Sequence, residues 1–64
     1  MQISHFQQMD PDLLYSLINM KLRNDYSSLA RLCQAMDIDE AALIAKLSSA
    51  GYQYQSAQNQ FRPT

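Results

Sequence analysis

The chain has 64 residues, 47% of them hydrophobic, with one glycine and two prolines, which leaves room for a single compact domain. Five Lys and Arg against six Asp and Glu give a net charge of −1, which argues against the strong phosphate attraction on which nucleic-acid binders depend. The lone Cys33 excludes an intrachain disulfide and a zinc site of familiar spacing. With no apolar run near the ~20 residues of a membrane span and no signal-peptide pattern, we expect a cytoplasmic protein.

The predicted domain covers residues 10–64, after an N-terminal tail at residues 1–9, and its first helix spans residues 11–23. Asp10 supplies an N-cap acceptor, and Pro11 suits the first helical position. The apolar residues cover an arc of roughly 200°, wider than one contact face needs, so we expect neighbours on two sides. This arc holds Leu13, Leu14, Leu17, Ile18, Met20 and Leu22, and the remaining arc holds Tyr15, Ser16, Asn19 and Arg23.

Lys21 falls inside the apolar arc of this helix. We expect its stem to pack on the core while its ammonium reaches water beside the negative end of the helix. The alternative is that Lys21 anchors a carboxylate or a phosphate at the edge of the domain.

Two shorter helices are predicted at about residues 28–36 and 40–50. Ser27 or Ser28 caps the first, whose inner stripe is Leu29, Leu32, Cys33 and Met36. Asp39 caps the second, and Ile38 lies at the spacing of a hydrophobic staple from Leu43. Its buried stripe is predicted as Leu43, Leu47 and Ala50, and Gly51 can take the left-handed conformation that ends a helix.

Beyond Gly51 the pattern changes to period 2, which predicts a β-hairpin with strands at about 52–55 and 60–62. A four-residue loop places Tyr54 opposite Phe61, and Pro63 stops the second strand. The apolar spacing from Leu29 to Gly51 resembles a helix-turn-helix unit, although Asp37 stands where a turn glycine is common. The predicted fold is mostly α, a three-helix helix-turn-helix-like bundle with a short C-terminal β-hairpin, which is the arrangement of a minimal winged helix.

A closer resemblance extends over about residues 10–62. It rests on Asp10-Pro11, Asn19-Met20-Lys21-Leu22-Arg23, Ser27-Ser28-Leu29, Gly51-Tyr52-Gln53-Tyr54 and Asn59-Gln60-Phe61. These segments resemble a family of short bacterial proteins catalogued only as a domain of unknown function. The resemblance implies a free-standing bacterial, cytoplasmic protein, and it supplies no activity, cofactor or catalytic residue.

The inventory of reactive residues predicts no catalysis, no cofactor and no metal. His5 lies in the tail, far in sequence from Cys33, which we expect to be a small buried apolar group. The acidic residues Asp37, Asp39 and Glu40 cluster in one turn without the ligand count or the glycine of a calcium loop. Capping and solvation explain this cluster better than a cation does.

A protein-interaction or self-association surface is predicted on the third helix, where small residues flank an isoleucine; it comprises Ala41, Ile44, Ala45 and Ser48. Two alternatives stay open: a plain solvated face, or a face covered by Ile3, Phe6 and Met9 of the same chain. A homodimer through the first or third helix is also possible.

The competing hypothesis is weak DNA binding, and the candidate contacts are Lys21, Arg23, Arg31, Lys46 and Arg62. Charge disfavours it, because segment 27–51 holds two cations against three carboxylates. The outward residues of the third helix are also not those that read bases.

Overall fold

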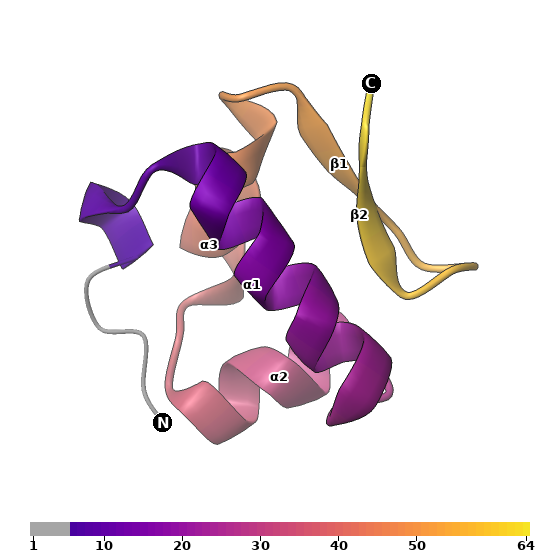
Figure 1. Cartoon of the computed structure of the whole chain (residues 1–64). Helices are drawn as coiled ribbons and strands as arrows, with labels where there is room; N and C mark the ends of the chain where they lie inside the picture. The colour runs from indigo at the N-terminus through magenta and orange to yellow at the C-terminus, as the bar shows by residue number, and fades with distance from the viewer. Residues whose placement is uncertain (1–5) are drawn as a thin grey trace.

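The computed structural model describes residues 6–64 and shows three helices followed by a two-stranded antiparallel sheet (Figure 1). A short 3-10 helix, η1 (Phe6–Gln8), precedes these elements, which are α1 (Pro11–Asn24), α2 (Leu29–Met36), α3 (Glu40–Ser48), β1 (Tyr52–Gln55) and β2 (Gln60–Pro63). The predicted fold class is confirmed. The boundaries differ by small amounts: α1 is one residue longer than predicted, α2 begins one residue later, α3 ends two residues earlier, and β2 is one residue longer because it includes Pro63.

The predicted N-caps are all formed by side-chain oxygens. Asp10 Oδ1 accepts from the backbone N–H of Asp12 at 3.0 Å, Ser28 Oγ from Arg31 at 3.2 Å, and Asp39 Oδ1 from Ala41 at 3.2 Å. Each bond satisfies one of the free N–H groups at a helix start, so the local sequence fixes where each helix begins.

The end of α2 and the turn after α3 use the left-handed region of backbone space. Asp37, which stands where a turn glycine is common in helix-turn-helix units, has φ 57° and ψ 49°, which is tolerable because Asp enters this region more easily than most residues do. Gly51 has φ 90° and leads directly into β1, as predicted.

The core is formed by one stripe from each helix together with Phe61 of β2. Its buried residues are Phe6, Leu14, Ile18, Leu22, Leu29, Leu32, Cys33, Met36, Ile38, Leu43, Leu47 and Phe61. The prediction that Ala50 belongs to this stripe is wrong, because α3 ends at Ser48 and the turn that follows leaves Ala50 exposed.

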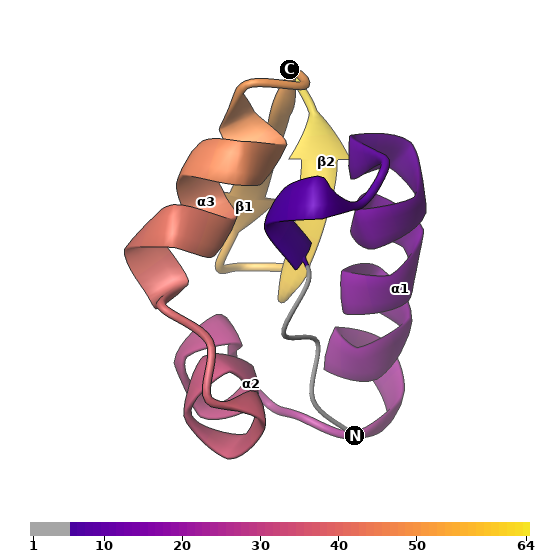
Figure 2. The same cartoon turned by 90° about the vertical axis from the view of Figure 1, so that its left-hand side faces the viewer.

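Helix α1 has neighbours on two sides, but the second side is not the predicted one. Leu14, Ile18 and Leu22 are buried on the side of the core, while Leu13 and Met20 are 60% and 50% exposed. The hairpin instead packs on the arc that carries Tyr15 and Asn19 (Figure 2). The apolar periodicity of the sequence does not predict this contact, because the contact is made by an aromatic stack and by hydrogen bonds.

Part of the predicted tail packs on the domain. Phe6 is buried in the core, Met9 is half-buried against it, and η1 contacts α3. The ammonium of Lys46 donates to the backbone carbonyl of Gln7 at 2.9 Å. Ile3 is a candidate cover for the third helix and His5 is a reactive residue of the tail, and both lie outside the described residues.

Candidate interaction surface

The outer face of α3 carries the predicted interaction residues Ala41, Ile44, Ala45 and Ser48, and all four are exposed. Leu43 and Leu47 point to the core from the opposite side of the helix. The η1 segment packs on α3 near Lys46 and leaves the four residues uncovered. Except for Ile44, which is 38% exposed, the face is built from small side chains.

A shallow groove runs between this face and strand β1. It has a volume of about 320 Å³ and is lined by Ile44 and Ser48 from α3 and by Tyr52, Gln53 and Tyr54 from β1. The hairpin sits beside α3 because β1 follows α3 after only the Gly51 turn. One wall is therefore a smooth helix face, and the other is a strand.

The strand wall presents a free edge. Tyr52 pairs with Pro63, and Tyr54 pairs with Phe61. Phe61 directs its N–H and C=O to the side chain of Asn19 rather than to β1, so Tyr54 and Phe61 form a pair without mutual backbone hydrogen bonds. The N–H and C=O groups of Tyr52 and Tyr54 consequently point away from β2, and among the described residues no protein group bonds to them.

The outer edge of β2 is closed. Asn19 Oδ1 accepts from the Phe61 N–H at 2.7 Å, and Asn19 Nδ2 donates to the Phe61 carbonyl at 3.0 Å. Asn19 thereby takes the place of a neighbouring strand, and Pro63 ends the edge with a residue that has no N–H. A sheet with one closed and one open edge favours strand addition at the open one.

A second set of polar contacts holds the hairpin on α1. Asn59, in the left-handed region with φ 53°, donates from Nδ2 to the carbonyls of Leu22 and Tyr26, each at 3.0 Å. Its Oδ1 accepts from the Tyr54 hydroxyl at 2.7 Å. We call Asn19 and Asn59 together the hairpin clasp.

The geometry of the clasp gives the quoted sequence motifs a physical role, because Asn19, Tyr54, Asn59 and Phe61 all belong to them. The family model described as "Domain of unknown function (DUF4250)" matches residues 8–61, from the end of η1 to Phe61. The chain belongs to this family. No curated protein and no solved structure matches the chain.

The clasp was missed by the sequence analysis of this family member. The sequence places Asn19 on the arc of the first helix outside the apolar one, and it predicts residues 56–59 only as a loop. One local feature of the sequence points to the clasp. Asn59 is the last residue of the loop, and asparagine is favoured in left-handed turn positions.

The candidate basic contacts come from four different elements: Lys21 and Arg23 from α1, Arg31 from α2, Lys46 from α3 and Arg62 from β2. Lys21 is half-buried, as expected for a lysine whose stem packs on the domain. Lys46 is half-buried and already bonds to Gln7, whereas Arg23, Arg31 and Arg62 are exposed. The exposed face of α3 itself carries no cation.

Cys33 is not placed for chemistry. It is buried on the inner face of α2, and desolvation, aided by the charges of Glu40 and Asp39, raises its pKa from 9.0 to about 11. A thiol with this pKa holds its proton at neutral pH, so it is a poor nucleophile and a poor metal ligand. Residues 6–64 contain no group of three or more His, Cys, Asp or Glu side chains that could hold a metal ion.

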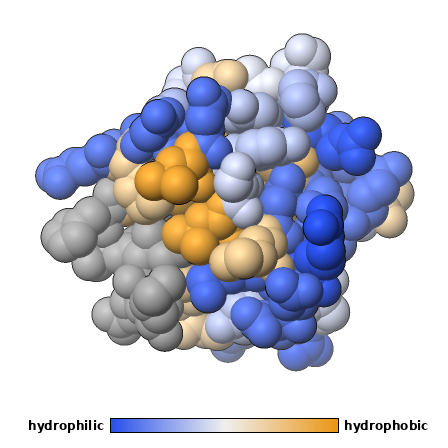
Figure 3. Space-filling view, in the orientation of Figure 1, coloured by the Kyte–Doolittle hydropathy of each residue, from blue (hydrophilic) through white to orange (hydrophobic). Residues whose placement is uncertain are grey.

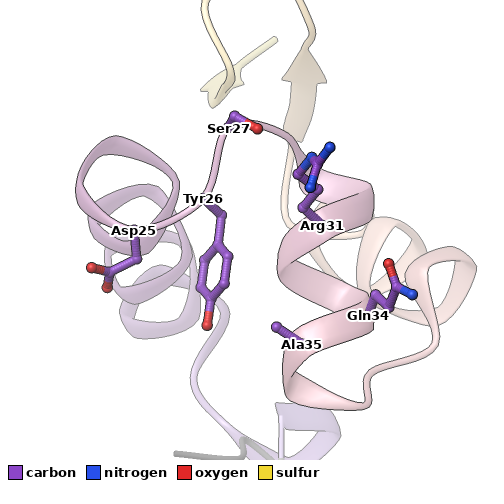
Figure 4. A pocket seen from close by; sticks show the side chains of 6 residues that line it. All are labelled: Asp25, Tyr26, Ser27, Arg31, Gln34 and Ala35. Atoms are coloured by element: carbon purple, nitrogen blue, oxygen red, sulfur yellow. The ribbon is translucent and has the colours of Figure 1, made fainter.

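A further hollow lies between α2 and the loop after α1 and has a volume of about 450 Å³. Figure 4 shows Tyr26 pointing into the gap toward Ala35, with Asp25 and Arg31 on opposite sides of the ring. A ligand site requires polar groups that converge on one point, and the charged groups of this hollow do not converge.

Within the described part of the chain, no helix is both long and apolar enough to cross a membrane.

Proposed function

We propose that the chain is a non-catalytic protein-interaction module that binds an extended segment of a partner protein in the groove between α3 and β1. The observation that carries the proposal is the free edge of β1 beside the small-residue face of α3. An added strand would bond to the N–H and C=O groups of Tyr52 and Tyr54. Its alternate side chains would rest on Ile44 and Ser48, which line the same groove.

The size of the α3 side chains supports this occupant. Neighbouring strands lie about 4.7–4.9 Å apart, so an added strand needs space immediately beside β1. Ser48, which lines the groove beside Ile44, projects little from the helix and has few rotamers to lose when covered. Strand β1 also lacks the Lys, Pro or bulge with which edge strands usually resist pairing.

The absence of catalysis is part of the same proposal. The raised pKa of Cys33 and the divergent charges of the α2 hollow both support it. A buried free thiol also suits a reducing compartment, and we therefore propose a cytoplasmic location in bacteria.

A displayed library of short peptides tests the groove directly. We expect selected peptides to shift the backbone amide resonances of Ile44, Ser48, Tyr52 and Tyr54. Chemical synthesis with an N-methyl group on Tyr54 removes one outward N–H without touching the hairpin bonds, and it should weaken binding by about tenfold, the equivalent of one hydrogen bond.

Two matched variants provide the controls. Ser48→Arg, at an exposed residue of α3 that lines the groove, should block it, while Ala30→Arg, at an exposed position of α2, should leave peptide affinity unchanged. Peptides that bind elsewhere, or that tolerate both N-methylation and Ser48→Arg, would refute strand addition at this groove.

Weak DNA binding remains the second candidate, because α3 occupies the place of a recognition helix and is exposed. Segment 27–51 has a net charge of −1, from Arg31 and Lys46 against Asp37, Asp39 and Glu40, and this disfavours phosphate contact. Titration with a mixed-sequence duplex separates the candidates. DNA binding would weaken steeply with salt and would shift α3 and hairpin amides, whereas the peptide site depends little on salt.

A further inference from the structure

We propose that two copies of this chain pair through the outer faces of their α1 helices, in antiparallel orientation. The proposal rests on α1 and is independent of the groove between α3 and β1. Leu13 and Met20 are the two most exposed large hydrophobic side chains described, and the half-buried Leu17 lies between them. Figure 3 shows the resulting hydrophobic area over α1, in the orientation of Figure 1.

The spacing of these residues suits a second helix as the occupant. Leu13, Leu17 and Met20 follow one another at intervals of four and three residues, which is the spacing of the seam between paired helices. Asn24, four residues later, continues the line to the last residue of α1. We call Leu13, Leu17 and Met20 the α1 seam.

Charge complementarity selects a second copy in antiparallel orientation. The N-terminal end of α1 carries Asp10 and Asp12, and its last turn carries Lys21 and Arg23. Antiparallel pairing sets the acidic end of each helix beside the basic end of the other, whereas parallel pairing sets like charges together. The helix dipoles add to the same preference.

The flanks of the seam fit a two-fold axis near Leu17. At 100° per residue, Asp12, Ser16 and Arg23 lie on one flank, and Lys21 lies on the other. An axis beside Leu17 brings Asp12 of one copy opposite Arg23 of the other, with the small Ser16 near the axis. Asp12 Oδ1 already accepts from the Tyr52 hydroxyl. Asp12 Oδ2 would accept from Arg23 of the second copy.

A shallow hollow lies where the partner helix would arrive. It has a volume of about 400 Å³ and includes Ser16, Met20, Arg23 and Asn24 among its lining residues. With the two-fold axis beside Leu17, Leu13 of the second copy lies at the C-terminal end of the seam, beside this hollow. The seam has three apolar residues per copy, whereas a standard interface has roughly 20–30 residues a side, so the dimer should form at high concentration and dissociate on dilution.

Sedimentation equilibrium on the full chain tests the pairing. The mass should rise with concentration from the 7.3 kDa of one chain toward twice that value. Leu13→Glu places a charge in the seam at a largely exposed position and should raise the dissociation constant by about tenfold or more. Ala30→Arg on α2 should leave it unchanged.

A charge swap tests the orientation. Arg23→Asp and Asp12→Arg should each weaken self-association, and an equimolar mixture of the two variants should restore dimers. In a parallel pair, the single variants would be no weaker than the parent. Circular dichroism of each variant checks folding, and Met20→Glu replaces Leu13→Glu if that variant fails to fold.

Three sedimentation results overturn the proposal: a monomer at every concentration, a dimer that persists in both Leu13→Glu and Met20→Glu, or a dimer lost with Ala45→Arg on α3. Cross-peaks from residues 1–5 to Leu13 and Met20 in a monomer would also overturn it and would assign the seam to the chain's own N-terminus.

Discussion

Replacing Asn19 with alanine tests whether a side chain closes the edge of β2. The variant removes both bonds to Phe61, of 2.7 and 3.0 Å, and leaves one N–H and one C=O of the strand without a protein partner. A buried group left unpaired costs about 1–3 kcal/mol. Both bonds are part-buried, so water replaces some of the loss, and we expect a total of about 2–3 kcal/mol.

That loss is large for a chain of this length. At ~0.05–0.15 kcal/mol per residue, 64 residues give roughly 3–10 kcal/mol of total stability. With a urea m-value of about 1 kcal/mol/M, typical of small domains, the midpoint should fall by about 2–3 M. Urea unfolding followed by circular dichroism measures this shift.

The matched control is Ser16→Ala, at an exposed position of the same helix, which should stay within ~0.5 kcal/mol of the parent. Hydrogen exchange adds a local readout, because the Phe61 amide should lose protection in Asn19→Ala. Equal midpoints for the two variants, with Phe61 still protected, would refute the idea that Asn19 replaces a strand.

Three further changes test the core and its titrating groups. Leu43→Ala should cost about 2–5 kcal/mol, because Leu43 is fully buried and its removal leaves a cavity; a denaturation midpoint unchanged from the parent would contradict this. The pKa of Cys33 in the folded chain is raised from 9.0 to about 11. Between these two pH values the thiol ionises more readily in the unfolded chain, so the free energy of unfolding should decrease as the pH rises. A Cys33→Ala variant should show a shallower decline in urea titrations. Asp12→Asn should lower the raised pKa of Tyr52, since the hydrogen bond to the Asp12 carboxylate is its main cause, and nuclear magnetic resonance of the Tyr52 ring against pH measures this; Asp37→Asn, at a carboxylate that does not contribute to the shift, should leave that pKa unchanged.

Local signals predicted most of this fold. Asp10, Ser28 and Asp39 cap their helices through side-chain bonds that span only two or three residues, so the sequence around each start is sufficient. The pairing of Tyr54 with Phe61, whose ring centroids lie 5.4 Å apart, followed from period-2 alternation and loop length. These features depend on neighbours along the chain, which a sequence displays directly.

The docking of the hairpin could not be predicted in the same way. Asn19 and Phe61 are separated by 42 residues, and a polar residue that bonds across such a distance leaves no mark in apolar periodicity. Tyr15 likewise stacks on Tyr52 with ring centroids 4.0 Å apart, although the helical wheel places it away from the main stripe. The exposure of Leu13 has the same origin, because the hairpin takes the polar side of α1 and leaves part of the apolar arc uncovered.

The two proposed surfaces lie on different sides of the molecule, and this arrangement has a consequence for affinity. Figures 1 and 2 place α1 and α3 on opposite sides of the domain. A dimer joined through the α1 seam would therefore present two copies of the groove, both facing outward. A partner with two binding segments would gain avidity from such a dimer, whereas a single peptide would not. Leu13→Glu should accordingly weaken binding of a tandem peptide and leave the affinity for one peptide unchanged, whereas loss of both affinities would show that the α1 seam also shapes the groove.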